Sequence, residues 1–260
     1  MSASVQQLLD LKGKVAVVTG GSRGLGLQIA EALGEMGARV ALTARKKDEL
    51  DQAVSHLKDK GIDARAYVCD IGKREQVGPL ADALLKDFGR IDILVNNAGA
   101  TWGAPAEEHP LEAWDKLVNV NMTGAFLLSQ QLAKRSMIPA RWGRIINVAS
   151  IAGLTASDPR VVRTVAYNAT KHGLVGLTRQ CAAEWGEHGI TVNAICPGFF
   201  PSKMTRATLD AAGKAVLELT PTRRLGNDED LKGLAVLLAS EAGRHITGQA
   251  IAVDGGATIL

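Results

Sequence analysis

The stretch that decides the fold is KVAVVTGGSRGLGLQIAEALGEM, residues 14–36, in which an apolar run, a glycine-rich turn and an amphipathic segment follow one another directly. The apolar run predicts a buried strand, and the segment Leu27–Met36 predicts a helix. Gly20, Gly24 and Gly26 between them are spaced GxxxGxG. Because glycine lets backbone N–H groups approach closely, such a turn at the positive end of a helix can bind a pyrophosphate. The alternative is a turn that only joins strand to helix.

Further runs rich in Val, Ile and Ala recur along the chain, at a spacing typical of strands that alternate with helices. Their hydrophobicity is continuous rather than alternating, which indicates strands that are buried on both faces of a parallel sheet. Together with the first run they predict seven strands, namely Lys14–Thr19, Arg39–Thr43, Ala64–Cys69, Ile91–Val95, Arg144–Ala149, Thr191–Cys196 and Ala250–Val253.

Segments with helical periodicity lie between these strands, and Leu50, Ala53 and Leu57, for example, fall on one helix face. The alternation predicts an α/β fold: a doubly wound, seven-stranded parallel sheet with helices on both faces, whose ligands bind at the carboxyl ends of the strands. It continues to residue 253 without a Pro- or Ser-rich linker. We therefore expect residues 1–260 to form a single domain.

Composition and charge exclude several classes of function. The chain has 260 residues, of which 46% are hydrophobic, and its formal charge of +3 is not gathered into a basic block, so we expect no nucleic-acid partner. It has no run of about eighteen apolar residues and does not begin like a signal peptide, which predicts no membrane partner and a cytoplasmic location. Cys69, Cys181 and Cys196 and the five histidines lack ligand spacing, so we expect no metal.

The segment after the second strand bears on the choice of dinucleotide. NAD sites usually place an acidic residue roughly 20 residues beyond the glycines, where it binds the ribose hydroxyls. Here the window reads Thr43-Ala44-Arg45-Lys46. Arg45 and Lys46, together with Arg23 in the glycine turn, could pair with a 2′-phosphate, which predicts NADP(H) as the cofactor. The alternative is that Arg45 and Lys46 are solvated residues at the start of a helix.

Four motifs in order along the chain resemble the short-chain dehydrogenase/reductase family: TGGSRGLG at 19–26, NNAG at 96–99, YNATK at 167–171, and Pro197-Gly198. The resemblance covers nearly the whole chain. It implies a Rossmann fold and an oxidoreductase that interconverts a ketone and a secondary alcohol by hydride transfer with a nicotinamide.

The resemblance also implies where the cofactor binds. Asp70 should meet the adenine ring, Asn97 should line the adenosine pocket, and Ser202 stands where the family commonly has a threonine at the nicotinamide carboxamide. Alternatively, Asp70 is a helix N-cap and Asn97 is a turn residue. The predicted cofactor-binding set is Gly20, Ser22, Arg23, Gly24, Leu25, Gly26, Arg45, Lys46, Asp70, Ile71, Asn97, Ala98, Gly99, Tyr167, Lys171, Pro197, Gly198 and Ser202.

Chemistry points to the catalytic residues. A carbonyl that accepts hydride develops negative charge on its oxygen, so the site needs a proton donor. Tyr167 can be that donor if a cation lowers its pKa, ordinarily about 10, and Lys171 lies roughly 6 Å further along the same helix face. Ser150, at the carboxyl edge of the sheet, can donate to the same oxygen. The resemblance adds Asn121, as the holder of a water; alternatively Asn121 bonds its own helix backbone.

The substrate is less well defined by the sequence. We expect residues 151–163 to form a loop over the substrate, in which Arg160 and Arg163 either bind an anionic group or face solvent. This loop and the segment PGFFPSKMT resemble gluconate 5-dehydrogenases and also 3-oxoacyl-carrier-protein reductases. The arginines favour a sugar acid, such as 5-ketogluconate, whereas the apolar side chains of Leu154, Val161, Val162, Phe199 and Phe200 would suit an acyl chain.

Two further expectations follow. A protein that senses a dinucleotide without chemistry is an alternative of another class, but the retained Tyr167, Lys171, Ser150 and Asn121 argue against it. The apolar ending from Gly248 to Leu260 resembles those that join family tetramers, so we expect a homotetramer.

Overall fold

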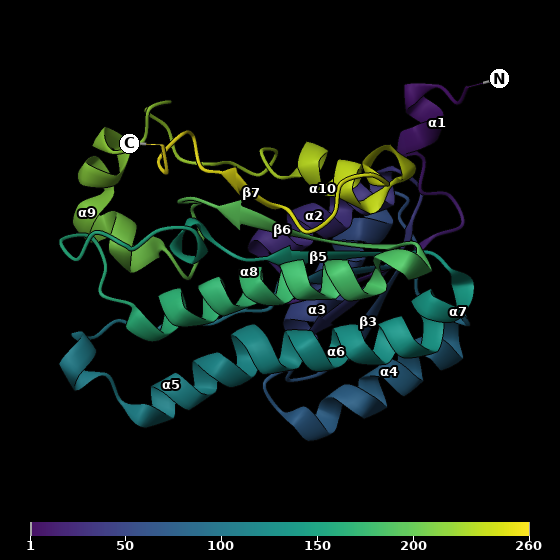
Figure 1. Cartoon of the computed structure of the whole chain (residues 1–260), viewed down its shortest axis with the longest axis horizontal. Coiled ribbons are helices and arrows are strands. Elements are labelled where there is room, and N and C mark those ends of the chain that lie inside the picture. The colour runs from purple at the N-terminus through teal and green to yellow at the C-terminus, as the bar shows by residue number, and fades with distance from the viewer. Residues whose placement is uncertain (1, 260) are drawn as a thin grey trace.

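Seven parallel strands form the centre of the computed structural model, which describes residues 2–259, in the order β3-β2-β1-β4-β5-β6-β7 (Figure 1). The doubly wound sheet that the sequence predicts is confirmed, and each predicted strand end lies within two residues of the observed one. The strands are β1 Val15–Thr19, β2 Arg39–Ala44, β3 Ala64–Val68, β4 Ile93–Asn96, β5 Gly143–Val148, β6 Ile190–Pro197 and β7 Ala250–Val253.

Burial differs between the middle and the edges of the sheet. Every residue of β1, β4, β5 and β6 is buried, as continuous apolar runs predict. The edge strands depart from the expectation of burial on both faces: β7 is only partly buried, and Val68 in β3 has 59% of its surface exposed. The reason is position, because an edge strand has a neighbour on one side only.

Helices cover both faces of the sheet. On one face α2, α3 and α10 pack through Ile29, Leu50 and Leu238, and on the other face α4 and α6 pack through Leu84 and Leu128 (Figure 1). The α-helices are α1 Val5–Leu9, α2 Gly24–Glu35, α3 Lys47–Asp59, α4 Arg74–Phe88, α5 Leu111–Val118, α6 Gly124–Leu132, α7 Ile138–Ala140, α8 Val165–Trp185, α9 Arg206–Glu218 and α10 Lys232–Ala239. No helix within residues 2–259 is long and apolar enough to cross a membrane.

Two helices have features that bear on the site. α2 begins at Gly24, three residues before the predicted start at Leu27, because the last part of the glycine turn already forms the first helical turn. The π-helical segment Asn119–Thr123 joins α5 to α6 without a break. π-helical turns are rare and occur frequently at functional sites.

Candidate active site

The glycine turn lies at the carboxyl end of β1 and has the geometry of a phosphate cradle. Gly20 and Gly24 have φ values of +63° and +53°, which favour glycine. A Cβ on Gly20 would lie 2.9 Å from the Cα of Ala98, whereas one on Gly24 would meet nothing within 4 Å. Arg23, the N-cap residue of α2, makes no side-chain capping bond to that helix among the described residues. The turn therefore offers backbone N–H groups and open space, which fits a dinucleotide phosphate.

Thr19 holds the segment after β4 against this turn. Its Oγ1 accepts hydrogen bonds from the backbone N–H groups of Asn97 and Ala98, both at 3.0 Å. Asn97 in turn donates its side-chain amide to the carbonyl oxygens of Thr19 and Gly20. The Asn97 side chain thus serves the local backbone, as the turn-residue alternative expected, while the residue also lies on the cavity wall. Thr19 is a residue that sequence reasoning missed.

A cavity of about 700 Å³ runs along this edge of the sheet, and it is named the nucleotide cavity because the glycine turn forms part of its wall. The predicted residues on its wall are Gly20, Ser22, Arg23, Gly24, Leu25, Arg45, Lys46, Asp70, Ile71, Asn97, Ala98, Gly99, Ser150, Tyr167, Lys171, Pro197, Gly198 and Ser202. Gly26 and Asn121 are not on the wall. A Cβ on Gly26 would come within 2.4 Å of the carbonyl oxygen of Gly20, so this glycine lets α2 pack beneath the turn.

Other parts of this wall settle the alternative for Asp70 and add one residue to the site. Asp70 Oδ1 accepts from the backbone N–H of Gly72 at 3.1 Å, and α4 begins only at Arg74, so Asp70 is not the N-cap of that helix. The wall also holds Glu49, which sequence reasoning missed because the residue lies in the first turn of α3, beyond the window that we searched. Its carboxylate is bonded to Arg23, 26 residues earlier in the chain.

Tyr167 and Lys171 lie one turn apart on α8 and both line the cavity. The Lys171 Nζ donates to the carbonyl oxygen of Val148 at 2.7 Å and lies 5.5 Å from the centre of the Tyr167 ring. Lys171 is buried and Tyr167 is half-buried. The helix therefore places both side chains toward the nucleotide cavity, in the arrangement that their spacing predicted.

Burial has the largest effect on the protonation of this pair. It raises the pKa of Tyr167, an effect partly offset by a hydrogen bond with Ser150. It lowers the pKa of Lys171 to about 8. Sequence reasoning expected the lysine charge to lower the pKa of Tyr167, and in this respect the structure differs. The physical reason is that both groups are desolvated, which disfavours the phenolate and the ammonium alike.

Ser150 and Asn121 reach the site in different ways. Ser150 follows β5, and its Oγ accepts from the backbone N–H of Ala152 at 3.1 Å while the residue lines the cavity beside Tyr167. Asn121, in the π-helical segment, is buried, and within residues 2–259 its side chain makes no hydrogen bond to its own helix. It accepts from the N–H of Ala100 at 2.9 Å and donates to the Ala100 oxygen and to Thr170 Oγ1, both at 3.0 Å.

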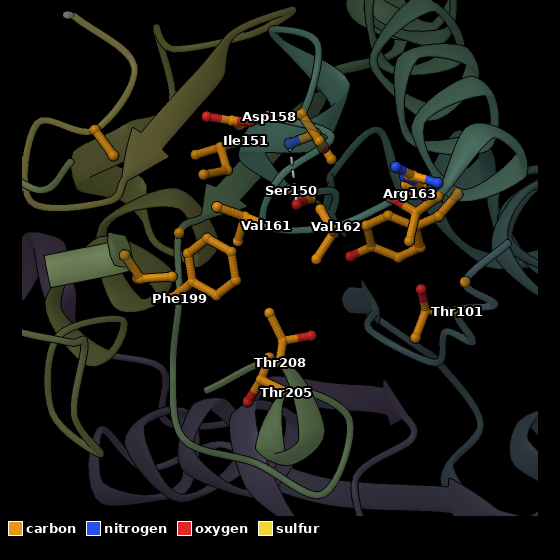
Figure 2. A pocket seen from close by; sticks show the side chains of 18 of the residues that line it. Thr101, Ser150, Ile151, Asp158, Val161, Val162, Arg163, Phe199, Thr205 and Thr208 are labelled. Atoms are coloured by element: carbon orange, nitrogen blue, oxygen red, sulfur yellow. Dashed lines mark hydrogen bonds between the residues drawn. The ribbon is translucent and has the colours of Figure 1, made fainter. Parts of the chain in front are cut away.

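A second cavity, of about 890 Å³, adjoins the first at Ser150, Tyr167 and Gly198 (Figure 2). Most residues from Ile151 to Thr164 contribute to one wall of this cavity. Figure 2 shows Phe199 and Val161 on the side of the cavity opposite Thr101. Val162 also lines this cavity, but Leu154 and Phe200 do not.

Charged side chains are few in this second cavity. Arg160 pairs with Asp158, at 2.6 Å between Nη2 and Oδ2, and lies off the wall. Arg163 lies on the wall and makes no ion pair with any residue from 2 to 259. α9, whose role the sequence did not indicate, adds Thr208 and Val216. In the described part of the chain, no three His, Cys, Asp or Glu side chains gather in a group that could hold a metal ion.

A phosphate cradle on a parallel sheet, with a lysine on the wall of the nucleotide cavity and a tyrosine where that cavity meets a second one, defines a dinucleotide-dependent oxidoreductase. The family model described as "short chain dehydrogenase" matches residues 14–212. The chain therefore belongs to the short chain dehydrogenase family, and the predicted family and enzyme class are confirmed.

Relatives with different substrates are similar to this chain. The gluconate 5-dehydrogenase of Gluconobacter oxydans is 38% identical, over 97% of each chain. The rhamnolipids biosynthesis 3-oxoacyl-[acyl-carrier-protein] reductase of Pseudomonas aeruginosa is 41% identical, over 95% of this chain and 97% of its own. A crystal structure of a gluconate 5-dehydrogenase from Burkholderia cenocepacia, in complex with NADP and tartrate, has a TM-score of 0.93 and 34% identity, over 99% of this chain and 100% of that one.

Proposed function

We propose that the protein interconverts a ketone and a secondary alcohol, with Tyr167 as the general acid and base. The observation that carries this proposal is the position of Tyr167, Ser150 and Gly198 where the nucleotide cavity and the second cavity meet. The cofactor is NADP(H), which supplies or accepts the hydride when bound. It is also the cofactor in the similar structure from Burkholderia cenocepacia.

Each catalytic residue has a role that its contacts support. Tyr167 Oη gives its proton to the carbonyl oxygen during reduction and takes one back during oxidation. Ser150 Oγ donates to the same oxygen, which stabilises the developing negative charge. Lys171 holds a proton at Nζ beside Tyr167. Asn121 fixes the backbone of Ala100, and Gly99 lies between Asn121 and Lys171, where a water would be held.

The nucleotide would lie along the first cavity. The glycine turn, with Ser22 and Leu25, would hold the pyrophosphate, and Asp70 with Ile71 would face the adenine. Asn97, Ala98 and Gly99 would line the adenosine side, and Pro197, Gly198 and Ser202 would meet the nicotinamide end. Arg23, Arg45 and Lys46 would meet the 2′-phosphate.

For the substrate we favour a sugar acid such as 5-ketogluconate. Arg163, which makes no ion pair within residues 2–259, offers a cation for a carboxylate, and several threonines on the wall, among them Thr101 and Thr208, can bond hydroxyl groups (Figure 2). A 3-oxoacyl thioester is the second candidate, because Val161, Val162 and Phe199 give the same cavity apolar surface. NADPH oxidation with 5-ketogluconate, an acetoacetyl thioester and a simple diketone distinguishes these classes.

Replacement of Tyr167 tests the reaction itself. Tyr167→Phe removes the proton donor but keeps the ring, so turnover should fall by about 10³-fold while NADPH binding changes by less than about twofold. Turnover is followed by NADPH absorbance and binding by fluorescence titration. Unchanged turnover would remove Tyr167 from the mechanism. Absence of turnover by the unmodified protein with every ketone would leave the non-catalytic, dinucleotide-sensing alternative.

We also propose a cytoplasmic homotetramer. Leu111, Trp114 and Phe126 on α5 and α6 expose 69%, 37% and 37% of their surface, and exposed apolar side chains on neighbouring helices are typical of subunit interfaces. Light scattering coupled to size-exclusion chromatography should give four times the monomer mass of 27.4 kDa. A monomer mass would contradict the proposal.

A further inference from the structure

Glu49 lies on the wall of the nucleotide cavity and joins two segments that meet there. It is the third residue of α3, and only 23% of its side chain is exposed. Its Oε1 accepts from Arg23 Nη1 at 2.9 Å and lies 3.2 Å from Lys46 Nζ. One carboxylate oxygen thus connects the glycine turn to the start of α3.

The partners of Glu49 are two of the three cations on this part of the wall. The third, Arg45, makes no ion pair among the residues that the structure describes. Two of the groups expected to meet a 2′-phosphate therefore already have an anionic partner. The three cations and one carboxylate leave a smaller positive charge than the sequence indicates.

This carboxylate affects the two forms of the nucleotide in opposite ways. A 2′-phosphate is dianionic or nearly so, so Glu49 repels it and competes for the same N–H groups of Arg23 and Lys46. A free ribose hydroxyl is a donor, and a carboxylate at this place in a dinucleotide site can accept its hydrogen bond. Glu49 has the chemistry of the acidic residue in NAD sites, although it comes later in the chain than the window that we searched.

We propose that Glu49 is a specificity-determining residue that reduces the preference of this site for NADP(H) over NAD(H). The inference rests on the proposed function, because it assumes that the cavity binds a nicotinamide dinucleotide. The carboxylate weakens binding of the 2′-phosphate and offers a hydrogen-bond acceptor to a 2′-hydroxyl. The site therefore accepts both cofactors to a greater extent than its three cations alone would allow.

Binding measurements without turnover test this role. The dissociation constants of NADPH and NADH are measured by fluorescence titration for the unmodified protein and for Glu49→Gln, which keeps the shape and removes the charge. Because partly exposed ion pairs are weak, NADPH binding should tighten by about three- to tenfold. NADH binding should stay the same or weaken by up to about threefold. The difference between the variants should shrink at high salt.

Asp51→Asn is the matched control for charge. Asp51 lies on the same helix, pairs with Lys47 at 2.5 Å and does not line the cavity. This variant also removes one negative charge, so it should change the dissociation constants of NADPH and NADH by the same small factor. Glu49→Ala, measured in the same way, provides a second variant, and thermal unfolding of each establishes that it is folded.

The other outcomes separate the inference from the proposed function. Weaker NADPH binding in Glu49→Gln would mean that the carboxylate only positions Arg23 and Lys46, and it would overturn the inference. An equal change for both nucleotides, as in Asp51→Asn, would overturn it as well. In both cases the proposed reaction would stand. If the unmodified protein bound neither nucleotide, the proposed function itself would fail.

Discussion

The nucleotide cavity and the second cavity share Ser150 and Tyr167 but are built differently. Much of the first is backbone at the carboxyl ends of strands, fixed by hydrogen bonds such as those of Thr19 to Asn97 and Ala98. The second is walled by side chains of residues 151–164 and of α9, which lie outside the sheet. The carboxyl ends of buried strands restrict which residues can occupy them, so the first cavity could be predicted from the sequence. Segments outside the sheet are less restricted and can vary with the substrate.

The largest effect on stability should come from the backbone-built cavity. Thr19→Val leaves the N–H groups of Asn97 and Ala98 without their acceptor, which should cost about 2–3 kcal/mol of unfolding free energy. Nucleotide binding should weaken with it. Urea unfolding and fluorescence titration measure the two effects.

Thr43→Val is the matched control for this prediction. Thr43 stands beside Thr19 in register on β2, and its buried Oγ1 has no hydrogen-bond partner among residues 2–259. Its replacement should leave stability unchanged or raise it. Equal losses in the two variants would show that the Thr19 hydroxyl does not hold this loop.

A second prediction concerns the buried Lys171 on the wall of the nucleotide cavity. Burial lowers the pKa of Lys171 to about 8 in the folded protein, from the ordinary lysine value of 10.5 that the unfolded chain has. Between these values the unfolded chain binds more protons than the folded one, so stability should rise with pH. The cost of the buried charge is fully present below pH 8. From pH 8 to pH 9.5 the gain should be about 2 kcal/mol.

Lys171→Met should lack this gain. The difference in pH dependence between the unmodified protein and the variant gives the contribution of Lys171 alone, because the buried thiols and Tyr167 titrate in both proteins. Urea unfolding at several pH values gives the two slopes. If stability changed with pH at the same rate in both proteins, Lys171 would not be buried in a form whose pKa is lowered.

The smallest effect should come from the side-chain-built cavity. Arg163→Gln should raise the KM for a carboxylate substrate by about tenfold and leave that of a neutral ketone unchanged, because one partly exposed ion pair is lost. Arg160→Gln is the control, since Arg160 is paired with Asp158 and lies off the wall. Equal increases in KM for the two variants would show that the positive charge of the loop attracts the substrate, without a direct contact between the substrate and Arg163.

The sequence predicts the sheet and the residues at its carboxyl edge better than it predicts the contacts between distant segments. The strands were found because buried parallel strands are continuous apolar runs, and Tyr167 and Lys171 were paired because helix geometry fixes their spacing. Edge strand β3 departs from the burial expected, since it includes Arg65 and has a neighbouring strand on one side only.

The site residues that sequence reasoning missed depend on contacts between distant segments. Glu49 and Arg23 are 26 residues apart, and nothing in either local sequence shows that they meet. The difference between Arg160 and Arg163 is similar, because both were candidates for an anion. Only the pairing of Arg160 with Asp158 separates them.

The π-helical segment Asn119–Thr123 has a consequence for tolerance of sequence length in this region. A π-helical turn contains one residue more than an α-helical turn, and each added residue rotates the following helix by about 100°. Leu117 before it and Leu128 after it are both fully buried, but eleven residues of regular α-helix amount to a net rotation of only about 20°, so these two side chains do not need the extra residue to share a face. What depends on the segment is Asn121, whose side chain bonds Ala100 and Thr170. Deletion of a single residue here would therefore displace Asn121 from these contacts, whereas most substitutions at exposed positions of the same helix would be harmless.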